Sequence, residues 1–539
     1  MPRFSIVTPV YDPPEAVLRA MLRSVTAQAN GDWELCLVDD ASPSPHVARV
    51  LAEAADRDPR VRVQRRGANG GIVAASNDGL AMATGEFVVL LDHDDELHPD
   101  ALALIGQALD ASPEADYAYS DEDKIDEAGN RSGPFFKPDW SPERFRTQMY
   151  TCHVSVLRRT LVEEVGGFHE GFEGSQDWDL VLRVTERARQ VVHVPHVLYH
   201  WRMLATSTAA GGEAAKPYAY EAGTRAIQAH CERIGFPAIA SHSEEYPGVY
   251  QLRPALTEHP LVSIVIPTRG STREVRAQNT VLVTHCLRSV IDDSTYDNFE
   301  VVIVADTTMD RAIAEELREI GGPRLRLVDY DRPFNFSDKI NVGALKSHGE
   351  HLLMLNDDME VVTPDWIERL LMYSSFPGIG AVGGHLVFGD GRLQHVGVML
   401  RGGLPGHLYR GFSGDYGGYA NTVRVANNYS AVTGACLMTP RATFDQVGGL
   451  SLQFPLSFND VDFCLKVRAV GQRVVYDPDT VLFHFESSSR SPDVSEWERE
   501  LLLERWYHVA RHDPYDNPNF HASSVHMVPP VYMSDGVTV

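Results

Sequence analysis

The sequence of 539 residues repeats itself once, and this duplication constrains its fold more than any other feature. Residues 4–11 read FSIVTPVY and residues 261–268 read LVSIVIPT, so Ser5 matches Ser263 at an offset of 258 residues. Further matches keep their order along the chain while the offset grows slowly, as loop insertions would make it. Solenoid repeats have periods of roughly 20–50 residues, so this pattern indicates one domain of about 250 residues that occurs twice.

The matched segments extend through most of both halves. The further pairs are LRSV at 22–25 and 287–290, DWELCLVDD at 32–40 and NFEVVIVAD at 298–306, residues 77–95 and 341–359, residues 165–184 and 447–467, and LYHWR at 198–202 with LFHFE at 482–486. Only short motifs agree within these pairs. Because the halves have diverged this far, we expect them to do different jobs.

The repeat also predicts the domain organisation. We expect a first domain at 1–240, a connector at 241–260, a second domain at 261–490, and a C-terminal helix and tail at 491–539. The connector carries three prolines and mixed charge, which favours a short ordered segment over a flexible Gly/Ser linker. The sequence WERELLLERWYHV in the tail has helical periodicity.

Each half opens with a strand, a helix and a second strand. The segments SIVTPV, ELCLV and FVVLL are short, continuous apolar runs, which is typical of strands buried in a parallel sheet. Strands that alternate with helices predict an α/β fold with a doubly wound, mostly parallel sheet in each half. Ligands of such sheets bind at the carboxyl ends of the strands.

Composition excludes several classes of partner. The 48 Lys and Arg residues are outnumbered by 74 Asp and Glu, and the net charge of −26 argues against nucleic acid as a partner. No run approaches the roughly 18 apolar residues of a membrane span, and the N-terminus lacks the apolar core of a signal peptide. The six cysteines are scattered without a CxxC pair, which favours a cytoplasmic location.

An acidic cluster follows a buried strand in each half. Asp92-His93-Asp94-Asp95 occupies this position in the first half, and Asn356-Asp357-Asp358 occupies it in the second. Neighbouring carboxylates repel one another, and Mg²⁺ or Mn²⁺ bound together with substrate phosphates removes that penalty. The alternative is a solvated loop or a helix cap, but recurrence at matching strand ends favours a metal site.

A second pair of acids begins a helix in each half. Asp177 lies in QDWD and Asp460 lies in NDVD, and each motif follows a Val-Gly-Gly turn. Capping and the helix dipole alone would explain one acid per motif. The recurrence favours a general base that takes a proton from a substrate hydroxyl.

Two further positions recur with weaker signals. His200 and His484 follow apolar runs, and each is either a packed histidine or a contact to a metal or a diphosphate. Asp40 and Asp306 end the second strand, where an acid either accepts the N3 hydrogen of a uracil or thymine ring or simply belongs to a surface turn. The chain has no P-loop, HExxH, GxSxG or early GxGxxG motif, which removes the usual support for ATPases, zinc proteases, serine hydrolases and dehydrogenases.

These residues together resemble the inverting glycosyltransferases of family 2, which have the GT-A fold. The resemblance covers about residues 3–235 and 260–490, and its motifs include VDDAS, LLDHDDELHPDAL, GSQDWDLVLR and LYHWR in the first half, and PFNFSDKINVGAL, LLMLNDDMEVVTPDW, LQHVGV and NDVDFCLKVR in the second. Together the halves resemble the tandem enzymes of bacterial O-antigen and related surface-polysaccharide assembly.

The resemblance implies roles for individual residues. The family's catalytic base falls on Asp177 and Asp460, and its metal ligands fall on Asp94, Asp95, His200, Asp358 and His484. Nucleotide-sugar binding falls on Pro9, Tyr11, Asp40, Asp92, Pro267, Asp306, Asp357, Gln394 and His395. Asn356 departs from the first acid of the family's DxD motif, so we expect a weaker metal site in the second half.

The function implied is a metal-dependent, inverting transfer of sugars from UDP-, dTDP- or GDP-sugars to a lipid-linked or free glycan, with Mg²⁺ or Mn²⁺ as cofactor. Two active halves would add two sugars in sequence at the inner face of the cytoplasmic membrane. The main alternative is that one half catalyses while the other binds or scaffolds glycans. A nucleotidyltransferase would need a Gly-rich basic loop after the first strand, and a non-catalytic carbohydrate-binding protein would not need paired metal acids and bases.

Overall fold

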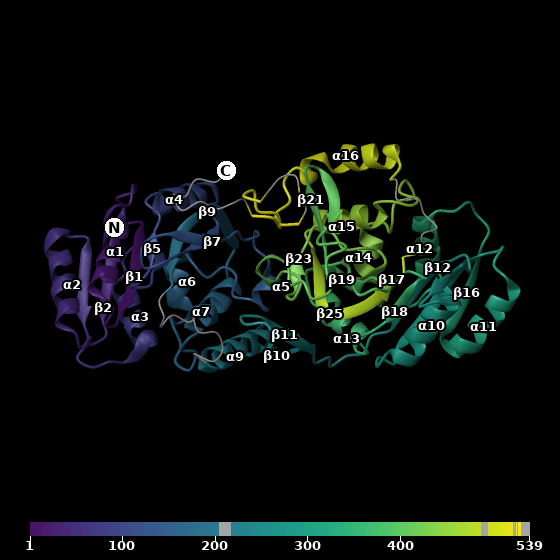
Figure 1. The fold of residues 1–539 in the computed structure, drawn as a ribbon, viewed down its shortest axis with the longest axis horizontal. Helices are drawn as coiled ribbons and strands as arrows, with labels where there is room; N and C mark the ends of the chain where they lie inside the picture. Colours follow the sequence, from purple (N-terminus) through teal and green to yellow (C-terminus); the bar gives the residue numbers. More distant parts are fainter. Residues whose placement is uncertain (204–216, 487–493, 521–523, 525, 530–539) are drawn as a thin grey trace.

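The computed structural model describes residues 1–203, 217–486, 494–520, 524 and 526–529. Two α/β domains lie side by side along the long axis of the molecule, with the first half of the chain in one and the second half in the other (Figure 1). The predicted fold class is confirmed in both halves.

The first domain is built on a sheet with the strand order β3-β2-β1-β4-β8-β6-β9-β5, with β7 pairing to β6. Strands β3 to β4 pair in parallel, β8 runs antiparallel to β4 and β6, and β6 is parallel to β9. The strands are β1 (Phe4–Val10), β2 (Trp33–Asp39), β3 (Val61–Arg65), β4 (Phe87–Leu90), β5 (Glu96–Leu97), β6 (Ala115–Ile125), β7 (Arg131–Phe135), β8 (Ser155–Arg158) and β9 (Gln190–Arg202). The helices are α1 (Glu15–Thr26), α2 (Pro45–Arg57), α3 (Gly71–Met82), α4 (Ala101–Ala111), α5 (Pro142–Phe145), α6 (Arg159–Glu164), α7 (Gln176–Thr185) and α9 (Pro217–Ile234).

The second domain repeats this topology in the order β16-β15-β12-β17-β24-β19-β25-β18, with β20 and β23 added at β19 and β25. Its strands are β12 (Val262–Thr268), β13 (Thr272–Val275), β14 (Gln278–Val281), β15 (Phe299–Asp306), β16 (Leu325–Tyr330), β17 (His351–Leu355), β18 (Met359–Val361), β19 (Ile379–Val387), β20 (Leu393–His395), β21 (Val398–Arg401), β22 (Leu404–His407), β23 (Asn427–Asn428), β24 (Cys436–Pro440) and β25 (Arg473–His484). Its helices are α10 (Leu282–Asp293), α11 (Arg311–Gly321), η1 (Gly322–Arg324), α12 (Phe336–Leu345), α13 (Trp366–Ser374), η2 (Tyr419–Asn421), α14 (Arg441–Gln446) and α15 (Asn459–Ala469).

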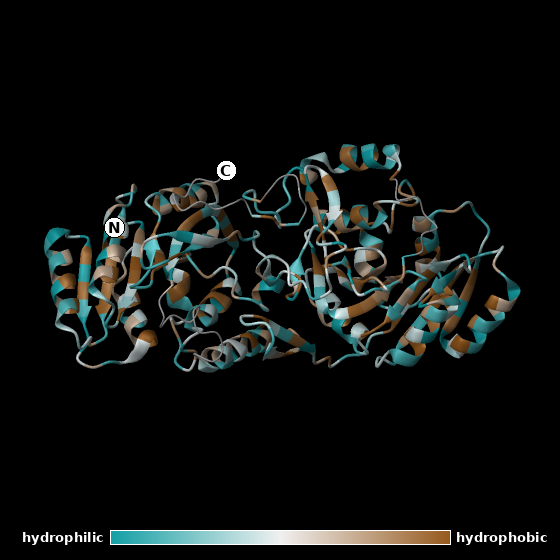
Figure 2. Cartoon of the chain, viewed as in Figure 1, coloured by the Kyte–Doolittle hydropathy of each residue, from teal (hydrophilic) through white to brown (hydrophobic). Residues whose placement is uncertain are grey.

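Helices cover both faces of each sheet because its central strands are apolar on both sides. Figure 2 shows these strands as the brown interior, with hydrophilic residues on the outer helix faces. Helix α1 buries Leu18, Met21, Leu22 and Val25, a spacing that puts all four on one side of the helix. A doubly wound core forms as a result, and its strand ends remain free to build a site.

A repeated glycine sets how closely one helix approaches the sheet. A Cβ atom at Gly79 of α3 would lie 2.6 Å from Val7 Cγ1, and one at Gly343 of α12 would lie 2.3 Å from Val265 Cγ1. Both distances are too short for any side chain, so the glycine lets the helix pack directly on the first strand of its domain. This requirement explains why NDG in the first half is matched by NVG in the second.

The connector is ordered, and it contacts both domains. Strands β10 (Ala238–His242) and β11 (Tyr250–Pro254) form an antiparallel hairpin. The Tyr250 ring packs against Trp178 of the first domain at 4.9 Å between centroids, and the Leu252 carbonyl accepts a hydrogen bond of 3.5 Å from Arg369 of the second.

The C-terminal region also joins the domains. Helix α16 (Glu496–Ala510) lies on the second domain, where Arg505 donates a hydrogen bond of 2.8 Å to Asp462. The chain then returns between the halves (yellow in Figure 1), and Asn517 donates to Asp121 of the first domain at 2.9 Å. Among the residues that the structure describes, no helix is both long and apolar enough to cross a membrane.

Candidate active sites

A cavity of about 890 Å³ opens at the carboxyl ends of β1, β2 and β4 in the first domain. Helix α7 and the chain before β8 complete its wall. Six of the residues predicted from the sequence line this one cavity, namely Pro9, Tyr11, Asp40, Asp92, Asp94 and Asp177. The fold therefore gathers residues that are up to 168 positions apart in the chain into one place.

Asp40 is held in the cavity wall by the start of α3. The backbone N–H groups of Gly70 and Gly71 donate to its two carboxylate oxygens at 2.9 and 2.8 Å. Gly71 has a φ of +82°, a conformation that glycine adopts without strain. The carboxylate thus has a fixed direction at the end of β2.

The acids Asp92 and Asp94 lie together in the cavity wall. Burial raises the pKa of Asp92, the negative charges of Asp94 and Asp177 raise it further, and His153 opposes them. Ligand atoms of Asp92, Asp95 and His153 all lie within 4.8 Å of one another. The carboxylates of this cluster, whose negative charges repel one another, fit a hard divalent cation.

Asp95 and His200 lie behind this wall rather than in it. The two oxygens of Asp95 accept hydrogen bonds from the Tyr199 hydroxyl at 2.5 Å and from the Arg202 backbone N–H at 2.7 Å. His200 Nδ1 lies 2.5 Å from an oxygen of Asp123, on the opposite side of β9 from Tyr199. Neither residue is among those that line the cavity. Their assignment as metal ligands stays a prediction, and of the two only Asp95 has ligand atoms close to those of Asp92.

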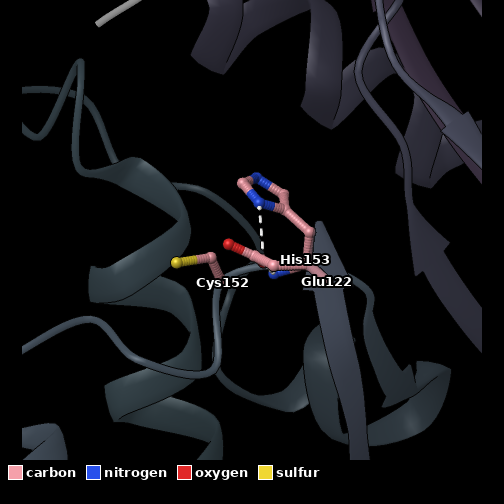
Figure 3. A group of neighbouring side chains, drawn as sticks. All are labelled: Glu122, Cys152 and His153. Atoms are coloured by element: carbon pink, nitrogen blue, oxygen red, sulfur yellow. Dashed lines mark hydrogen bonds and ion pairs between the residues drawn. The ribbon is translucent and has the colours of Figure 1, made fainter. Parts of the chain in front are cut away.

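His153, which the sequence analysis did not identify, lines the cavity beside the acids. Figure 3 shows its ring over Glu122, with Nδ1 3.4 Å from Glu122 Oε2. Burial opposes a positive charge on His153, but Glu122, Asp95 and Asp92 outweigh burial and raise the pKa of His153 to about 9. His153 therefore brings positive charge to the edge of the acidic cluster at neutral pH.

Glu122 and Cys152 accompany His153 without forming a metal site of their own. Burial opposes the charge of Glu122, but Lys137 and His153 outweigh it and lower the pKa of Glu122 to about 2. Burial raises the pKa of the Cys152 thiol well above its ordinary value, so the sulfur stays protonated. A protonated thiol and a carboxylate already paired with Lys137 at 3.1 Å are poor metal ligands.

This cluster has no counterpart in the second half, which explains why the repeat did not reveal it. Arg158 pairs with Phe87 in the first sheet, and Pro440 occupies the equivalent position opposite His351 in the second. Counting five residues back from each shows that Ala435 is the equivalent of His153. Comparison of the two halves can identify only the residues that both halves keep.

Asp177 and Asp460 occupy the first turns of α7 and α15 and line the cavities of their own domains. Burial raises the pKa of Asp177, which favours a carboxylate that accepts a proton. The second acid of each motif has a structural role, because Asp179 pairs with Arg183 at 2.6 Å and Asp462 with Arg505 at 2.8 Å.

The corresponding cavity of the second domain is smaller, about 320 Å³. It is lined by Asp460, Asn356 and His407, among others. The backbone N–H groups of Gly434 and Val461 donate to the two oxygens of Asp460 at 2.9 and 2.8 Å. The other residues predicted for this half lie outside the cavity wall; they are Pro267, Asp306, Asp357, Asp358, Gln394, His395 and His484.

Asp358 and His484 form a pair next to Asn356. His484 Nε2 lies 3.2 Å from Asp358 Oδ1 and 3.4 Å from Asn356 Nδ2. Among the described residues, the buried His484 Nδ1 atom has no hydrogen-bond partner. Asp357 accepts a hydrogen bond of 2.6 Å from the Thr268 hydroxyl. An imidazole and a carboxylate in contact fit a divalent cation, although the set carries less charge than the cluster in the first half.

Asp306 contacts a buried lysine. Lys339 Nζ lies 2.6 Å from Asp306 Oδ1 and donates to the Thr268 carbonyl at 2.8 Å. Asn341 matches Asn77 in the repeat, so the position of Lys339 corresponds to Ala75 in the first half. Backbone amides and Arg66, 3.4 Å away, hold the strand-end acid in the first half, whereas a buried lysine holds it in the second.

Gln394 and His395 are almost fully buried, at 3% and 0% exposure. His395 Nδ1 lies 3.0 Å from His407 Nδ1, and the Thr433 backbone N–H donates to His395 Nε2 at 3.3 Å. His407, which the sequence analysis did not identify, therefore stands between His395 and the cavity.

Comparison with known proteins places both halves in one family. The family model described as "Glycosyl transferase family 2" matches residues 5–166 and 263–447. The chain is 42% identical over 531 residues to the uncharacterized protein y4gI of Sinorhizobium fredii, which covers 96% of this chain and 57% of that protein. It is 38% identical over 524 residues to the O-antigen biosynthesis protein RfbC of Myxococcus xanthus, covering 96% of this chain and 40% of that protein.

The chain thus spans about half the length of these two relatives. A "PGL/p-HBAD biosynthesis glycosyltransferase" of Mycobacterium tuberculosis is 30% identical over 200 residues, covering 36% of this chain and 75% of that protein. Among solved structures, residues 1–349 of S. aureus TarS in complex with UDP align with a TM-score of 0.34 and 21% identity, covering 42% of this chain and 65% of that fragment.

Proposed function

The chain belongs to glycosyltransferase family 2, and from this premise we propose that each half transfers a sugar, with inversion, from a nucleotide-diphosphate sugar to a growing glycan. The observation that carries the proposal is the meeting of Asp40, Asp92, Asp94 and Asp177 in one cavity. Asp460 in the second cavity supports the same chemistry there.

In the first half, we assign the donor nucleotide to the part of the cavity formed by Pro9, Tyr11 and Asp40. The fixed carboxylate of Asp40 accepts the N–H of a pyrimidine ring, which favours a UDP- or dTDP-sugar. The diphosphate lies at Asp92 and Asp94, which would hold Mg²⁺ or Mn²⁺. A bound divalent cation supplies positive charge that stabilises the leaving nucleoside diphosphate.

Asp177 is the proposed base. The acceptor hydroxyl oxygen attacks the anomeric carbon as the bond from that carbon to the diphosphate oxygen breaks, and the hydroxyl proton passes to Asp177. A single displacement of this kind inverts the anomeric configuration and needs no covalent intermediate. The raised pKa of Asp177 supports this role, because a buried carboxylate gains more by taking up a proton.

Asp460 plays the same part in the second half, with Asp358 and His484 as the residues that would hold the cation. The acceptor that we propose is a surface polysaccharide of the O-antigen type, in line with the name of the Myxococcus relative. If the acceptor is lipid-linked, the chain works at the inner face of the cytoplasmic membrane by peripheral contact.

One alternative is that only the first half catalyses and the second binds glycan. The smaller second cavity and Asn356 in place of an acid favour this alternative. An acid after the same strand, Asp94 or Asp358, and an acid at the start of the same helix, Asp177 or Asp460, recur in both halves and favour two active halves.

The test is release of nucleoside diphosphate from a panel of UDP-, dTDP- and GDP-sugars, with Mn²⁺ or with EDTA. Cell-envelope glycolipid serves as acceptor. Wild type is compared with Asp177→Asn, Asp460→Asn and, as a control, Asp56→Asn on the exposed face of α2. We expect each of the first two variants to abolish turnover of one donor while donor binding stays, because the loss falls in the transition state.

If one of the two substitutions is silent and the other removes all turnover, one half is a binding module. Full activity in both variants would remove the assignment of the bases. No binding of any nucleotide sugar would contradict the proposed function as a whole.

A further inference from the structure

We propose that His407 donates a hydrogen bond from Nε2–H to an oxygen of the sugar acceptor bound at Asp460, and so selects the acceptor of the second half. This inference rests on the proposed function. It concerns a residue that belongs to the second domain alone.

A hairpin that occurs only in the second half, as far as the described residues show, brings His407 to the cavity. Strands β21 and β22 pair in antiparallel register with Val398 opposite His407, and both residues line the 320 Å³ cavity together with Asp460. The Leu408 backbone N–H donates to the Gly397 carbonyl at 3.1 Å, which ties the end of the hairpin to its start. The backbone pairing of the hairpin therefore fixes the position of His407 beside the cavity.

Hydrogen bonds behind the cavity determine which nitrogen of His407 carries the proton. A backbone N–H can only donate, so the bond from Thr433 makes His395 Nε2 an acceptor and leaves the His395 proton on Nδ1. That proton points at His407 Nδ1, 3.0 Å away, which must then accept. A neutral His407 consequently carries its proton on Nε2.

Both imidazoles are neutral in these surroundings. Burial lowers the pKa of His395 well below its ordinary value and lowers that of His407 to about 4, although the negative charge of Asp460 opposes the second shift. Within the described part of the chain, the contact to His395 is the one hydrogen bond that His407 makes. Its Nε2–H is thus left for a molecule in the cavity.

Asp460 and His407 together present an acceptor and a donor at one site. Each Asp460 oxygen takes one backbone hydrogen bond and keeps a second lone pair for the reacting hydroxyl. His407 can bind a neighbouring oxygen of the same sugar. The pair therefore matches an acceptor sugar that has a free oxygen next to its reacting hydroxyl.

We do not expect the first half to bind its acceptor through such a pair of histidines. Strand β7 pairs with β6 in the first half, as β20 pairs with β19 in the second. Phe135 lies opposite Glu122, and His395 lies opposite Leu386, so Phe135 occupies the position of His395. Phenylalanine cannot orient a second imidazole, so we expect the two halves to prefer different acceptors.

The first test measures the tautomers directly and needs no substrate. Long-range ¹H–¹⁵N spectra of the full chain labelled with ¹⁵N-histidine distinguish Nδ1–H from Nε2–H imidazoles, and His407→Gln and His395→Gln assign the two signals. We expect Nδ1–H at His395 and Nε2–H at His407 at pH 7. An Nδ1–H tautomer or a protonated ring at His407 would overturn the proposal.

The second test measures acceptor kinetics with the donor that the Asp460→Asn comparison identifies. His407→Phe keeps a flat ring without a donor, and His407→Gln keeps an N–H donor. We expect His407→Phe to lower kcat/KM for the acceptor about tenfold or more, with unchanged binding of the nucleoside diphosphate, and His407→Gln to restore most of it. For an acceptor that lacks the neighbouring oxygen, wild type and His407→Phe should have the same low kcat/KM.

His196→Gln, a substitution of an exposed histidine in the first domain, is the control for loss of an imidazole. Wild-type acceptor kinetics in His407→Phe would refute the inference while leaving the proposed function intact. Absence of all turnover in wild type would contradict the proposed function, whereas the tautomer measurement would still decide the geometry.

Discussion

At the scale of single residues, the two halves differ most clearly at the acid that ends the second strand. Two backbone amides and the partly exposed Arg66, 3.4 Å away, hold Asp40, whereas the buried Lys339 holds Asp306 at 2.6 Å. The Lys339 ammonium, with its side chain 2% exposed, must be compensated by its partners. The positive charge beside the predicted nucleotide site is thus buried in the second half and partly exposed in the first.

Removing that charge should destabilise the second domain. Lys339→Met leaves Asp306 without its cation, and we expect the free energy of unfolding to fall by about 2 kcal/mol, since Asp306 is partly exposed and recovers some hydration. Urea unfolding of Lys339→Met, Asp306→Asn and the double variant forms a double-mutant cycle. If the two single effects simply add, the 2.6 Å contact does not couple the residues.

Metal binding should also differ between the halves because Asn356 replaces an acid. In the presence of UDP, we expect wild type to bind two Mn²⁺ ions, with the site in the second half weaker by about tenfold for the loss of one charge. Titration followed by electron paramagnetic resonance should show Asp94→Asn removing the tighter site and Asp358→Asn the weaker one. Asp177→Asn should keep both sites, and two equal sites in wild type would contradict the effect assigned to Asn356.

At the scale of elements, the strands and helices that the repeat marks are those that both domains keep. The apolar runs became β1, β2 and β4, and the matched glycines became the close contacts of α3 and α12. Apolar periodicity and acids at strand and helix ends are local signals, and they predicted the fold class and the acids Asp40, Asp92, Asp94 and Asp177 of the first cavity. Pro9 and Tyr11 were predicted from the family resemblance. Within the described ranges, the Glu122–His153 cluster and the β21–β22 hairpin each occur in one half only, and tertiary contacts create them.

The position of Asp95 and His200 shows a second limit of local signals. Both belong to motifs that repeat, yet Tyr199 and the Arg202 backbone N–H bond Asp95, and Asp123 bonds His200 Nδ1. Alternation along β9 turns Tyr199 and His200 to opposite faces of the sheet. A sequence pattern gives the strand but not the partner that a side chain meets across it.

Asp116 ties three elements of the first sheet and should make their stability depend on pH. This residue of β6 forms ion pairs with Arg158 of β8 and with Arg189 directly before β9. Hydrogen bonds from Arg189, the largest cause, and from Arg158 lower the pKa of Asp116 to about 2. Because the folded pKa lies below the ordinary 3.8, the stabilisation is complete above pH 4 and is lost as pH falls toward 2.

We therefore expect Asp116→Asn to lower the free energy of unfolding by about 1 to 2 kcal/mol at pH 7, a range discounted because Arg189 is half exposed. Urea unfolding between pH 7 and pH 3 should show the gap to wild type narrowing only below pH 4. Asp56→Asn is the control, and a gap that stays constant down to pH 3 would contradict the linkage.

At the scale of the whole molecule, buried contacts hold the two domains in one arrangement. Glu143 of α5 is fully buried, and Arg473 of β25 lies 3.1 Å from it across the interface. Asn428 of the second domain accepts a hydrogen bond of 2.9 Å from Ser141, and Asn517 of the tail reaches Asp121. Two proposed sites on such a body have a fixed separation, which a flexible linker would not give.

The Glu143–Arg473 pair should therefore decide whether the halves unfold together. Arg473→Met leaves a buried carboxylate with Arg146, 3.2 Å away, as its remaining cationic partner, so we expect a loss of about 2 to 4 kcal/mol, toward the lower end of what breaking a buried pair costs. Differential scanning calorimetry should show one transition in wild type and two in Arg473→Met, because the less stable domain then unfolds without the other. The control is Arg311→Met, whose partner Glu315 lies on an exposed helix face, and it should keep one transition. A single transition at the wild-type temperature in Arg473→Met would mean that the connector hairpin and the tail, rather than this ion pair, couple the two halves.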